Sequence, residues 1–98
     1  MSYSADSRVA IAPGRFSCEV AGDLTILNTD SSTYYNLSGS GVRVWTLLEQ
    51  GERTVGALSD ILVGEYEIEP RRCVEELNEL LDGLIAAGLV VVQPGGAG

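Results

Sequence analysis

Apolar and polar residues alternate along the first half of the chain, as they do in half-buried β-strands. The clearest pattern lies in the segments 23–28, DLTILN, and 33–37, TYYNL, which are rich in β-branched and aromatic residues. The turn-forming residues TDSS at 29–32 separate them, so the sequence predicts a β-hairpin with a four-residue connection. Two earlier segments, 8–13 and 16–21, predict short strands.

After the hairpin, apolar residues recur every three or four positions, which is typical of amphipathic helices. The pattern predicts three helices, over residues 38–51, 54–64 and 70–88. Residues that favour helix ends mark these bounds: Ser38 or Ser40, Thr54 and Pro70 at the starts, and Gly51, Gly64 and Gly88 at the ends. A short acidic link, EYEIE, joins the second helix to the third.

The order of elements is a set of strands, three helices and a last short strand at LVVV, residues 89–92. This order predicts an α+β domain that is winged helix-turn-helix-like, with an N-terminal antiparallel hairpin, three α-helices and a short C-terminal strand. We expect one domain over residues 8–92. The polar segment 1–7 predicts a flexible lead-in, and the glycine-rich end, 93–98, predicts a disordered tail.

The third predicted helix carries more apolar surface than a small core requires. Its apolar arc spans roughly 160°, whereas a helix that covers one face of a core needs about 100°. The central stripe contains Val74, Leu77, Leu81, Leu84 and Ile85, and the residues that widen it are Cys73, Leu80 and Ala87. Either the helix packs against several neighbours, or one edge of its stripe stays free.

A free helix edge would form a groove with the strand 33–37. Such a groove accepts an extended peptide as an added strand, because backbone hydrogen bonds supply affinity and side-chain pockets supply specificity. Side chains alternate along a strand, so we expect Tyr35 and Leu37 to join Trp45 in the core. Tyr34 and Asn36 then point the other way.

The charge of the chain excludes several classes of partner. The 98 residues include 14 acidic and 6 basic side chains, a formal charge of -8, and every basic residue is Arg. Nucleic acids and anionic membranes require clustered basic residues, so we expect neither as a partner. Without a secretory signal or an apolar run long enough for a membrane span, we expect a cytoplasmic protein in which Cys18 and Cys73 stay reduced.

The sequence lacks the residues that most catalytic sites need. Histidine is absent, which excludes Ser-His and Cys-His pairs, and two isolated cysteines cannot complete a zinc site. The motif LSGSG is only part of a phosphate-binding loop. We interpret the acidic residues Glu75, Glu76, Glu79 and Asp82 as a solvated helix face. We therefore expect a protein that is not an enzyme and that needs no cofactor or metal.

Several short motifs, taken in order, resemble a known family. A hairpin that ends in Tyr-Tyr-x-Leu precedes a Trp followed by Leu-Leu, a helix after Thr-Val, a helix after an acid-Pro step, and a closing Ala-Gly-Leu. In this chain the motifs are Tyr34 to Leu37, Trp45 to Leu48, Thr54 and Val55, Glu69 and Pro70, and Ala87 to Leu89. Together they resemble the PqqD-like family, the RiPP recognition elements of ribosomal peptide biosynthesis. The resemblance covers about residues 8–92.

The resemblance implies a non-catalytic adaptor that binds the leader segment of a precursor peptide. In that family the leader lies as an added antiparallel strand between the last hairpin strand and the third helix. The peptide-binding residues that this implies here are Thr33, Tyr34, Tyr35, Asn36, Leu37, Cys73, Glu76, Leu77 and Leu80. A separate processing enzyme is the implied second partner. The stand-alone form is most similar to proteins that work with a transglutaminase-like leader peptidase in lasso-peptide pathways.

Three other interpretations stay open at the level of sequence. A PqqD-type partner of a radical SAM peptide-modifying enzyme would use the same groove with a different enzyme. A winged-helix DNA-binding module would need basic residues on the third helix, where Glu75 and Glu79 stand instead. A homodimerisation module would use the same excess of apolar surface. The acidic excess of the chain further suggests a leader of basic character.

Overall fold

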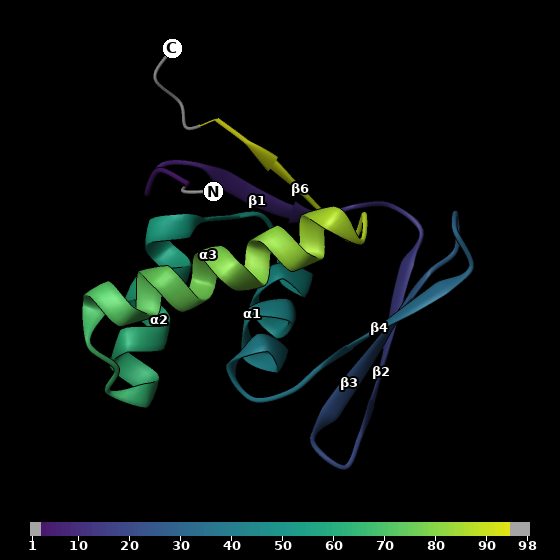
Figure 1. The fold of residues 1–98 in the computed structure, drawn as a ribbon, viewed down its shortest axis with the longest axis horizontal. Coiled ribbons are helices and arrows are strands. Elements are labelled where there is room, and N and C mark those ends of the chain that lie inside the picture. The colour runs from purple at the N-terminus through teal and green to yellow at the C-terminus, as the bar shows by residue number, and fades with distance from the viewer. Residues whose placement is uncertain (1–2, 95–98) are drawn as a thin grey trace.

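Two separate three-stranded antiparallel sheets lie against three helices in this protein (Figure 1). The computed structural model describes residues 3–94. The elements are β1 (Arg8–Ile11), β2 (Arg15–Val20), β3 (Asp23–Asn28), β4 (Thr33–Leu37), α1 (Ser40–Glu49), β5 (Arg53–Thr54), α2 (Val55–Tyr66), α3 (Pro70–Ala86) and β6 (Val90–Gln93). This architecture confirms the predicted mixture of antiparallel strands and three helices. The winged helix-turn-helix arrangement stays a prediction.

The sheet in the order β2-β3-β4 contains the predicted hairpin. β3 and β4 have the predicted bounds, and their register pairs Ile26 with Tyr35 and Leu24 with Leu37. β4 is an edge strand, and among the described residues no other strand pairs with its outer side. The peptide groups on that side are therefore not used by the sheet and can pair with an added strand.

The second sheet, in the order β5-β1-β6, joins segments that are far apart in the sequence. β1 pairs with β6 through Val9 and Val92, and with the two-residue strand β5 through Arg8 and Thr54. β5 was not predicted, because two residues are too few to carry a periodic pattern. Only the pairing with β1 makes this short segment a strand.

The start of α1 differs from the prediction. Its N-cap residue is Gly39, with φ 58°, and no side chain caps the helix. The expectation that Ser38 or Ser40 caps this helix was therefore wrong. A glycine reaches positive φ without strain, and the backbone makes the first turn through the N–H of Gly41, which donates to the Ser38 carbonyl at 3.2 Å.

The start of α2 confirms the prediction, and its end does not. The Thr54 hydroxyl oxygen accepts a hydrogen bond from the Ala57 N–H at 3.1 Å, as expected of an N-cap threonine. The helix continues past the expected end at Gly64 and stops at Tyr66, after which Glu67 adopts a left-handed conformation. Glycine lowers helix stability without breaking the hydrogen-bond pattern, so Gly64 is no obligatory end.

The packed face of α3 is rotated relative to the predicted stripe. Its buried residues are Cys73, Leu77, Leu81 and Leu84. Val74 and Ile85, expected in the stripe, are 38% and 36% exposed, so that part of the prediction was wrong. The helix packs against α2 and β6. The positions of these two elements determine which edge of its apolar surface is buried. Among the described residues, none of the helices is long and apolar enough to cross a membrane.

The N-terminal segment is attached to the domain from residue 3 onward. The Tyr3 hydroxyl donates to Asp82 Oδ1 at 2.6 Å. The carbonyl of Ala5 accepts the Gly56 N–H at 2.9 Å, which satisfies a free donor in the first turn of α2. The predicted flexible lead-in therefore packs on the domain over residues 3–7, and β6 includes Gln93 of the predicted tail. Residues 1–2 and 95–98, the remainder of both predictions, lie outside the described residues.

Candidate binding groove

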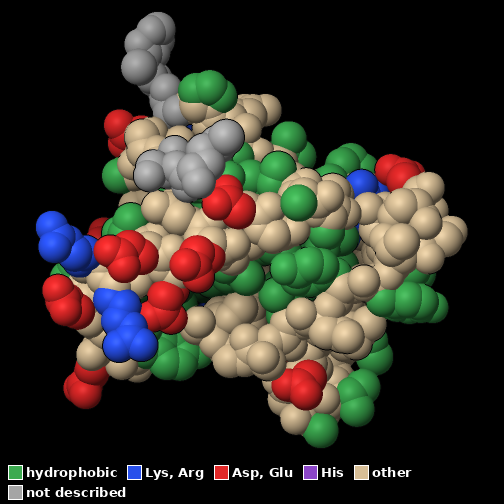
Figure 2. All heavy atoms as spheres, viewed as in Figure 1, with side chains coloured by type: hydrophobic (Ala, Val, Ile, Leu, Met, Phe, Trp, Pro, Cys, Tyr) green, Lys and Arg blue, Asp and Glu red, His purple; other side chains and the backbone are tan. Residues whose placement is uncertain are grey.

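A groove of about 390 Å³ runs between β4, the first turn of α1 and the middle of α3. Its lining residues are Asn36, Leu37, Ser38, Ser40, Gly41, Val44, Leu62, Ile68, Cys73, Glu76, Leu77, Glu79 and Leu80. Figure 2 shows hydrophobic side chains in the hollow between α3 and the β2-β3-β4 sheet, with acidic side chains along α3. The groove thus has an apolar interior and a polar rim. Its volume lies at the small end of the ~300–1,000 Å³ of ligand pockets, which is room for a few side chains of an extended chain.

The structure brings both predicted walls of the site together. From the predicted set, Asn36 and Leu37 of β4 line this space together with Cys73, Glu76, Leu77 and Leu80 of α3. The Asn36 side chain itself lies on the outer face of the sheet, where its Oδ1 accepts from the Thr25 hydroxyl at 2.9 Å. Thr33, Tyr34 and Tyr35 are not among the lining residues. They belong to the edge strand, so their contribution to the predicted site is their backbone.

Several lining residues were not predicted. They come from the loop after β4, from all three helices and from the α2–α3 connection, and they are Ser38, Ser40, Gly41, Val44, Leu62, Ile68 and Glu79. The small residues of SGSGV, which follow the hairpin and begin α1, were the available signal in the sequence, since small residues allow close approach of a ligand. Their arrangement around one groove depends on how α1 packs beneath β4 and α3. Local patterns in the sequence do not predict this packing.

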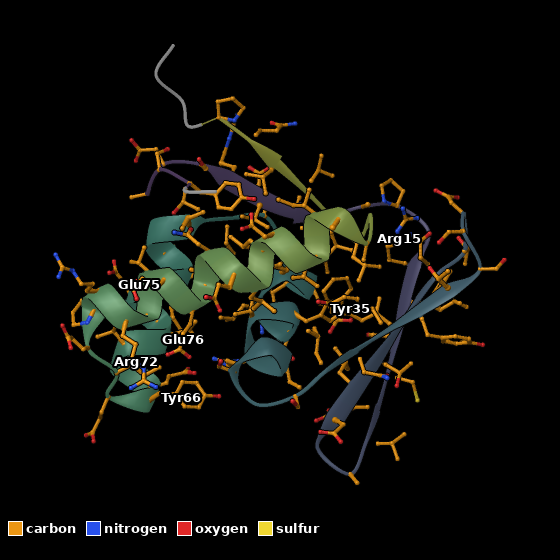
Figure 3. The ribbon with its side chains drawn as sticks, viewed as in Figure 1. Arg15, Tyr35, Tyr66, Arg72, Glu75 and Glu76 are labelled. Carbon is orange, nitrogen blue, oxygen red and sulfur yellow. The ribbon has the colours of Figure 1, made fainter. Side chains whose placement is uncertain are left out.

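Alternation along β4 gives its two tyrosines different roles. Tyr34 pairs with Leu27, which in turn pairs with Phe16, and all three side chains lie on the outer face of the sheet. Tyr34 is 72% exposed. Tyr35 lies on the inner face and points from β4 toward α3 (Figure 3). The predicted division into inward Tyr35 and outward Tyr34 is therefore confirmed.

Two side chains fasten the β2-β3-β4 sheet to the end of α3. Arg15 at the start of β2 donates from Nε to the Gly88 carbonyl at 2.9 Å, and Asn28 of β3 donates from Nδ2 to the Ala87 carbonyl at 3.0 Å. These donors satisfy carbonyl groups that a helix C-terminus leaves free, and the Arg15 cation suits the negative end of the helix dipole. The contacts join the sheet that carries one wall of the groove to the helix that carries the other.

The rim of the groove is acidic. Among the residues that line it, Glu76 and Glu79 are the charged ones. Arg72 donates from Nε to Glu76 Oε2 at 2.9 Å, one helical turn away on the solvent side of α3 (Figure 3). Glu79 is exposed and makes no salt bridge with the described residues. The charge at Glu79 therefore favours a cationic group on whatever enters the groove.

An ion pair holds the helices that carry the floor of the groove. Arg43 of α1 donates from Nε and Nη2 to the two carboxylate oxygens of Glu65 of α2, each at 2.8 Å. This paired hydrogen bond raises the pKa of Arg43 and lowers the pKa of Glu65. Both groups stay charged at neutral pH, so the ion pair links α1 to α2.

The cysteines and carboxylates of the described residues are not arranged as a reaction centre. Cys73 is 2% exposed, and its thiol donates to the Ser59 carbonyl at 3.7 Å. Cys18 is an exposed free thiol on the outer sheet face. Within residues 3–94, no group of three or more His, Cys, Asp and Glu side chains could hold a metal ion. The groove offers shape, apolar surface and charge, which are properties of a binding site.

Comparison with known proteins agrees with this description. Residues 23–90 match the model of the family described as coenzyme PQQ synthesis protein D (PqqD). The chain belongs to the PqqD family. This assignment confirms the resemblance identified from the sequence motifs. No curated protein matches the sequence significantly.

Two solved structures have a similar fold. TbiB1 in complex with the TbiA(beta) leader peptide is 25% identical, with a TM-score of 0.76 over 83% of this chain and 93% of TbiB1. A lasso peptide synthetase B1 complexed with the leader peptide has a TM-score of 0.71 at 19% identity, over 85% of this chain and 96% of that protein. The second likeness shows the fold alone.

The region that matches the PqqD family contains the whole groove. It begins at β3 and ends in β6, so it includes both walls and every lining residue. β1 and β2 precede the matched region. The candidate binding groove thus lies in the part of the molecule that defines it as a PqqD protein.

Proposed function

We propose that this PqqD-family protein is a non-catalytic adaptor that binds the leader segment of a ribosomally synthesised precursor peptide. The leader adds to the free edge of β4 as an antiparallel strand, and its inward side chains enter the groove against α3. The observation that carries this proposal is the combination of an unpaired strand edge with an apolar groove beside it. Edge and groove together offer backbone pairing and side-chain selection in one place.

The matched structures support the same kind of ligand. TbiB1, 25% identical over most of both chains, is in complex with a leader peptide. We further propose that the adaptor presents the bound precursor to a separate enzyme, and that this enzyme is the leader peptidase of a lasso-peptide pathway. An adaptor needs no catalytic group of its own, which agrees with the chemistry of the groove. The carboxylate of Glu79 on the rim of the groove favours a leader with basic residues next to its apolar ones.

Backbone amide shifts test the binding mode directly. We expect a leader peptide, taken from the precursor gene that neighbours the gene of this protein, to shift the amide signals of residues 33–37 and 73–80. In an antiparallel pair only alternate residues exchange hydrogen bonds with the partner, so hydrogen exchange should slow at alternate residues of β4. A peptide of the same composition in scrambled order is the control. If the leader leaves both segments unchanged, the proposed function is wrong.

A coupled assay tests the presentation step. We expect the neighbouring leader peptidase to cleave the precursor faster when this protein is present, and to lose that gain when the leader is deleted from the precursor. Equal cleavage rates with and without the protein, measured under conditions where the leader binds, would remove the peptidase from the proposal. A radical peptide-modifying enzyme would then be tested in its place.

A further inference from the structure

The sheet β5-β1-β6 also ends in a free edge, and β6 forms that edge. Among the described residues no strand pairs with the outer side of β6. The strand consists of Val90, Val91, Val92 and Gln93 and carries no charge. Edge strands are commonly protected by charged side chains, prolines or bulges, because their unpaired peptide groups bind other strands. Here the first such residue is Pro94, after the end of the strand, so β6 itself is open to a further strand.

The register of β1 and β6 determines which peptide groups point to the free edge. Ala12 donates its N–H to the Leu89 carbonyl at 3.0 Å, and β6 continues the same antiparallel ladder along β1. In such a ladder, residues that bond to the neighbouring strand alternate with residues that do not. Leu89 and Val91 therefore bond to β1. The N–H and C=O groups of Val90 and Val92 point away from the sheet.

An uncovered pocket of about 750 Å³ lies beside β6. It is lined by β6, by the C-terminal half of α3 and by the N-terminal segment, and Figure 1 shows β6 at the rim of the molecule. Ile85 of α3 and Val91 of β6 are 36% and 47% exposed. Among the lining residues Asp82 is the charged one, and it accepts the hydrogen bond of the Tyr3 hydroxyl. The pocket and the strand edge thus combine apolar surface with little charge.

The charge of the whole chain favours one kind of partner for this surface. The chain has a formal charge of -8, so a basic partner is attracted to its acidic faces rather than to this weakly charged one. A second copy repels the first unless the two meet where few charged groups approach each other. The edge of β6 meets this condition, since its residues are uncharged.

We propose that this protein forms a symmetric dimer in which β6 of one copy adds as an antiparallel strand to β6 of the other. A two-fold axis at Val91 pairs Val90 of each copy with Val92 of the other, and each of these pairs exchanges both of its backbone hydrogen bonds. An axis at Val92 would instead place Val90 opposite Pro94, which has no N–H to donate. The register with Val91 opposite itself therefore uses the free edge most fully.

The dimer covers the exposed apolar residues beside β6 and leaves the leader groove free. The two-fold axis is perpendicular to the joined sheet, so both α3 helices lie on the same face of it and Ile85 of each copy lies near the junction. None of the residues that line this pocket lines the groove beside β4. Each copy can therefore bind its own peptide, and the dimer does not depend on the proposed function.

Sedimentation equilibrium over a range of protein concentrations tests the dimer. The measurements use Cys18→Ser as the background, because an exposed thiol could join molecules by oxidation. We expect a reversible dimer that dissociates at micromolar concentrations, since the interface is small. Val91→Arg should weaken it by about tenfold or more, because it places two cations opposite each other. A background protein that stays monomeric at millimolar concentration would overturn the proposal.

Val20→Arg is the matched control. Val20 is 66% exposed and ends β2, an edge strand of the other sheet. This variant adds the same cation at an equally exposed valine, so its dimerisation should equal that of the background protein. Equal losses in Val20→Arg and Val91→Arg would show that added charge acts through the whole molecule and would contradict an interface at β6.

Two cysteine variants in the Cys18→Ser background test the register. In a non-hydrogen-bonded antiparallel pair the Cα atoms lie about 4.5 Å apart, within reach of a disulfide. Val91→Cys should therefore form a disulfide-linked dimer on mild oxidation, because this residue lies opposite itself. Gln93→Cys lies on the same face of the strand but opposite Leu89, so it should stay largely monomeric. Equal crosslinking of both variants would overturn the proposed pairing.

Salt and the processing enzyme separate the dimer from other uses of this surface. Mobile ions screen the repulsion between two acidic copies, so dimerisation should strengthen as ionic strength rises. If Val91→Arg leaves the oligomeric state unchanged but slows cleavage of the precursor by the peptidase, β6 binds the enzyme and the dimer is wrong. Loss of the dimer with leader binding intact would leave the adaptor function standing, whereas a dimer that binds no leader would overturn that function alone.

Discussion

The side chain of Tyr35 occupies the space that Gly83 leaves open on α3. Tyr35 Oη lies 2.6 Å from the position that a Cβ at residue 83 would take, while its Cζ is 3.7 Å from it. The observed position of the Tyr35 phenol against α3 therefore requires that residue 83 has no side chain. This contact, together with those of Arg15 and Asn28 at the end of α3, joins the β2-β3-β4 sheet to the C-terminal half of the helix.

The contact predicts a coupled pair of substitutions. Gly83→Ala should lower the free energy of unfolding by about 1–3 kcal/mol, because the new methyl group overlaps the phenol oxygen. Tyr35→Phe removes only that oxygen and should change stability little. In the double variant the methyl group meets ordinary packing distances, so we expect a coupling energy of about 0.5–3 kcal/mol. Urea unfolding of the four proteins measures it, and additive effects would contradict the stated role of the contact.

Trp45 is the largest side chain of the core, and it is 1% exposed. Trp45→Ala should lower the free energy of unfolding by roughly 3–5 kcal/mol, because it removes packing contacts and leaves a cavity. The indole Nε1 has no hydrogen-bond partner among the described residues, so Trp45→Phe loses no hydrogen bond and should be much milder. Denaturant unfolding followed by circular dichroism gives both values. Equal losses would show that polar contacts of the indole matter.

Leu80 and Val74 lie on different sides of the same helix. Leu80 lines the groove, whereas Val74 is 38% exposed and does not line it. Leu80→Arg should weaken leader binding by about tenfold or more, because it places a charge in the apolar groove. Val74→Arg should leave binding unchanged, and both variants should unfold close to the wild-type temperature. Calorimetric titration measures the affinities, and an unfolded Leu80→Arg would place that residue in the core instead.

The acidic rim of the groove predicts that the affinity for the leader depends on salt concentration. If the leader carries basic residues next to its apolar ones, its affinity should fall as ionic strength rises, because mobile ions screen the attraction to Glu79. Glu79→Gln should lower the affinity at low salt by up to about fivefold and flatten the salt dependence. Glu75→Gln, at an exposed position of α3 outside the groove lining, is the control. Equal effects of both variants would indicate a general field rather than a local contact.

Tyr3 and Asp82 hold the N-terminal segment against α3 in a pH-dependent way. Their hydrogen bond raises the pKa of Tyr3 from 10.0 to about 12 and lowers the pKa of Asp82 below its ordinary 3.8. The Tyr3 contribution to stability is complete below pH 10.0 and is lost as the pH rises through about 12. The Asp82 contribution is complete above pH 3.8 and is lost as the pH falls through its lowered folded value.

Tyr3→Phe isolates this contact. We expect it to lower the unfolding temperature at neutral pH and to speed hydrogen exchange at the Gly56 amide, which bonds to Ala5 in the same segment. The difference from the wild type should shrink toward both ends of the pH range. Tyr34→Phe, at a 72% exposed position, is the control. A difference that is constant with pH would show that Tyr3 acts through packing alone.

Local patterns in the sequence predicted the elements whose signals are local. The hairpin bounds were correct because β-branched and aromatic residues alternate within it, and the α2 start was correct because Thr54 caps its own helix. The cap of α1 and the strand β5 were missed, since a glycine start and a two-residue strand have no periodic signal. The resemblance to the family predicted the two walls of the groove, but it did not indicate Gly41 or Glu79 as lining residues.

The sequence by itself determined the strands of the hairpin, the three helices, the acidic charge and the lack of histidine chemistry, because each of these follows from residue type and spacing. The tertiary structure decided which edge of α3 is covered, how far β4 stands from it, and what lies on the floor between them. Those properties depend on contacts between residues far apart in the chain, such as Tyr35 with Gly83 and Gly41 with Leu80. The strands of the hairpin are thus a property of the sequence, and the free edge of β4 and the groove beside it are properties of the fold.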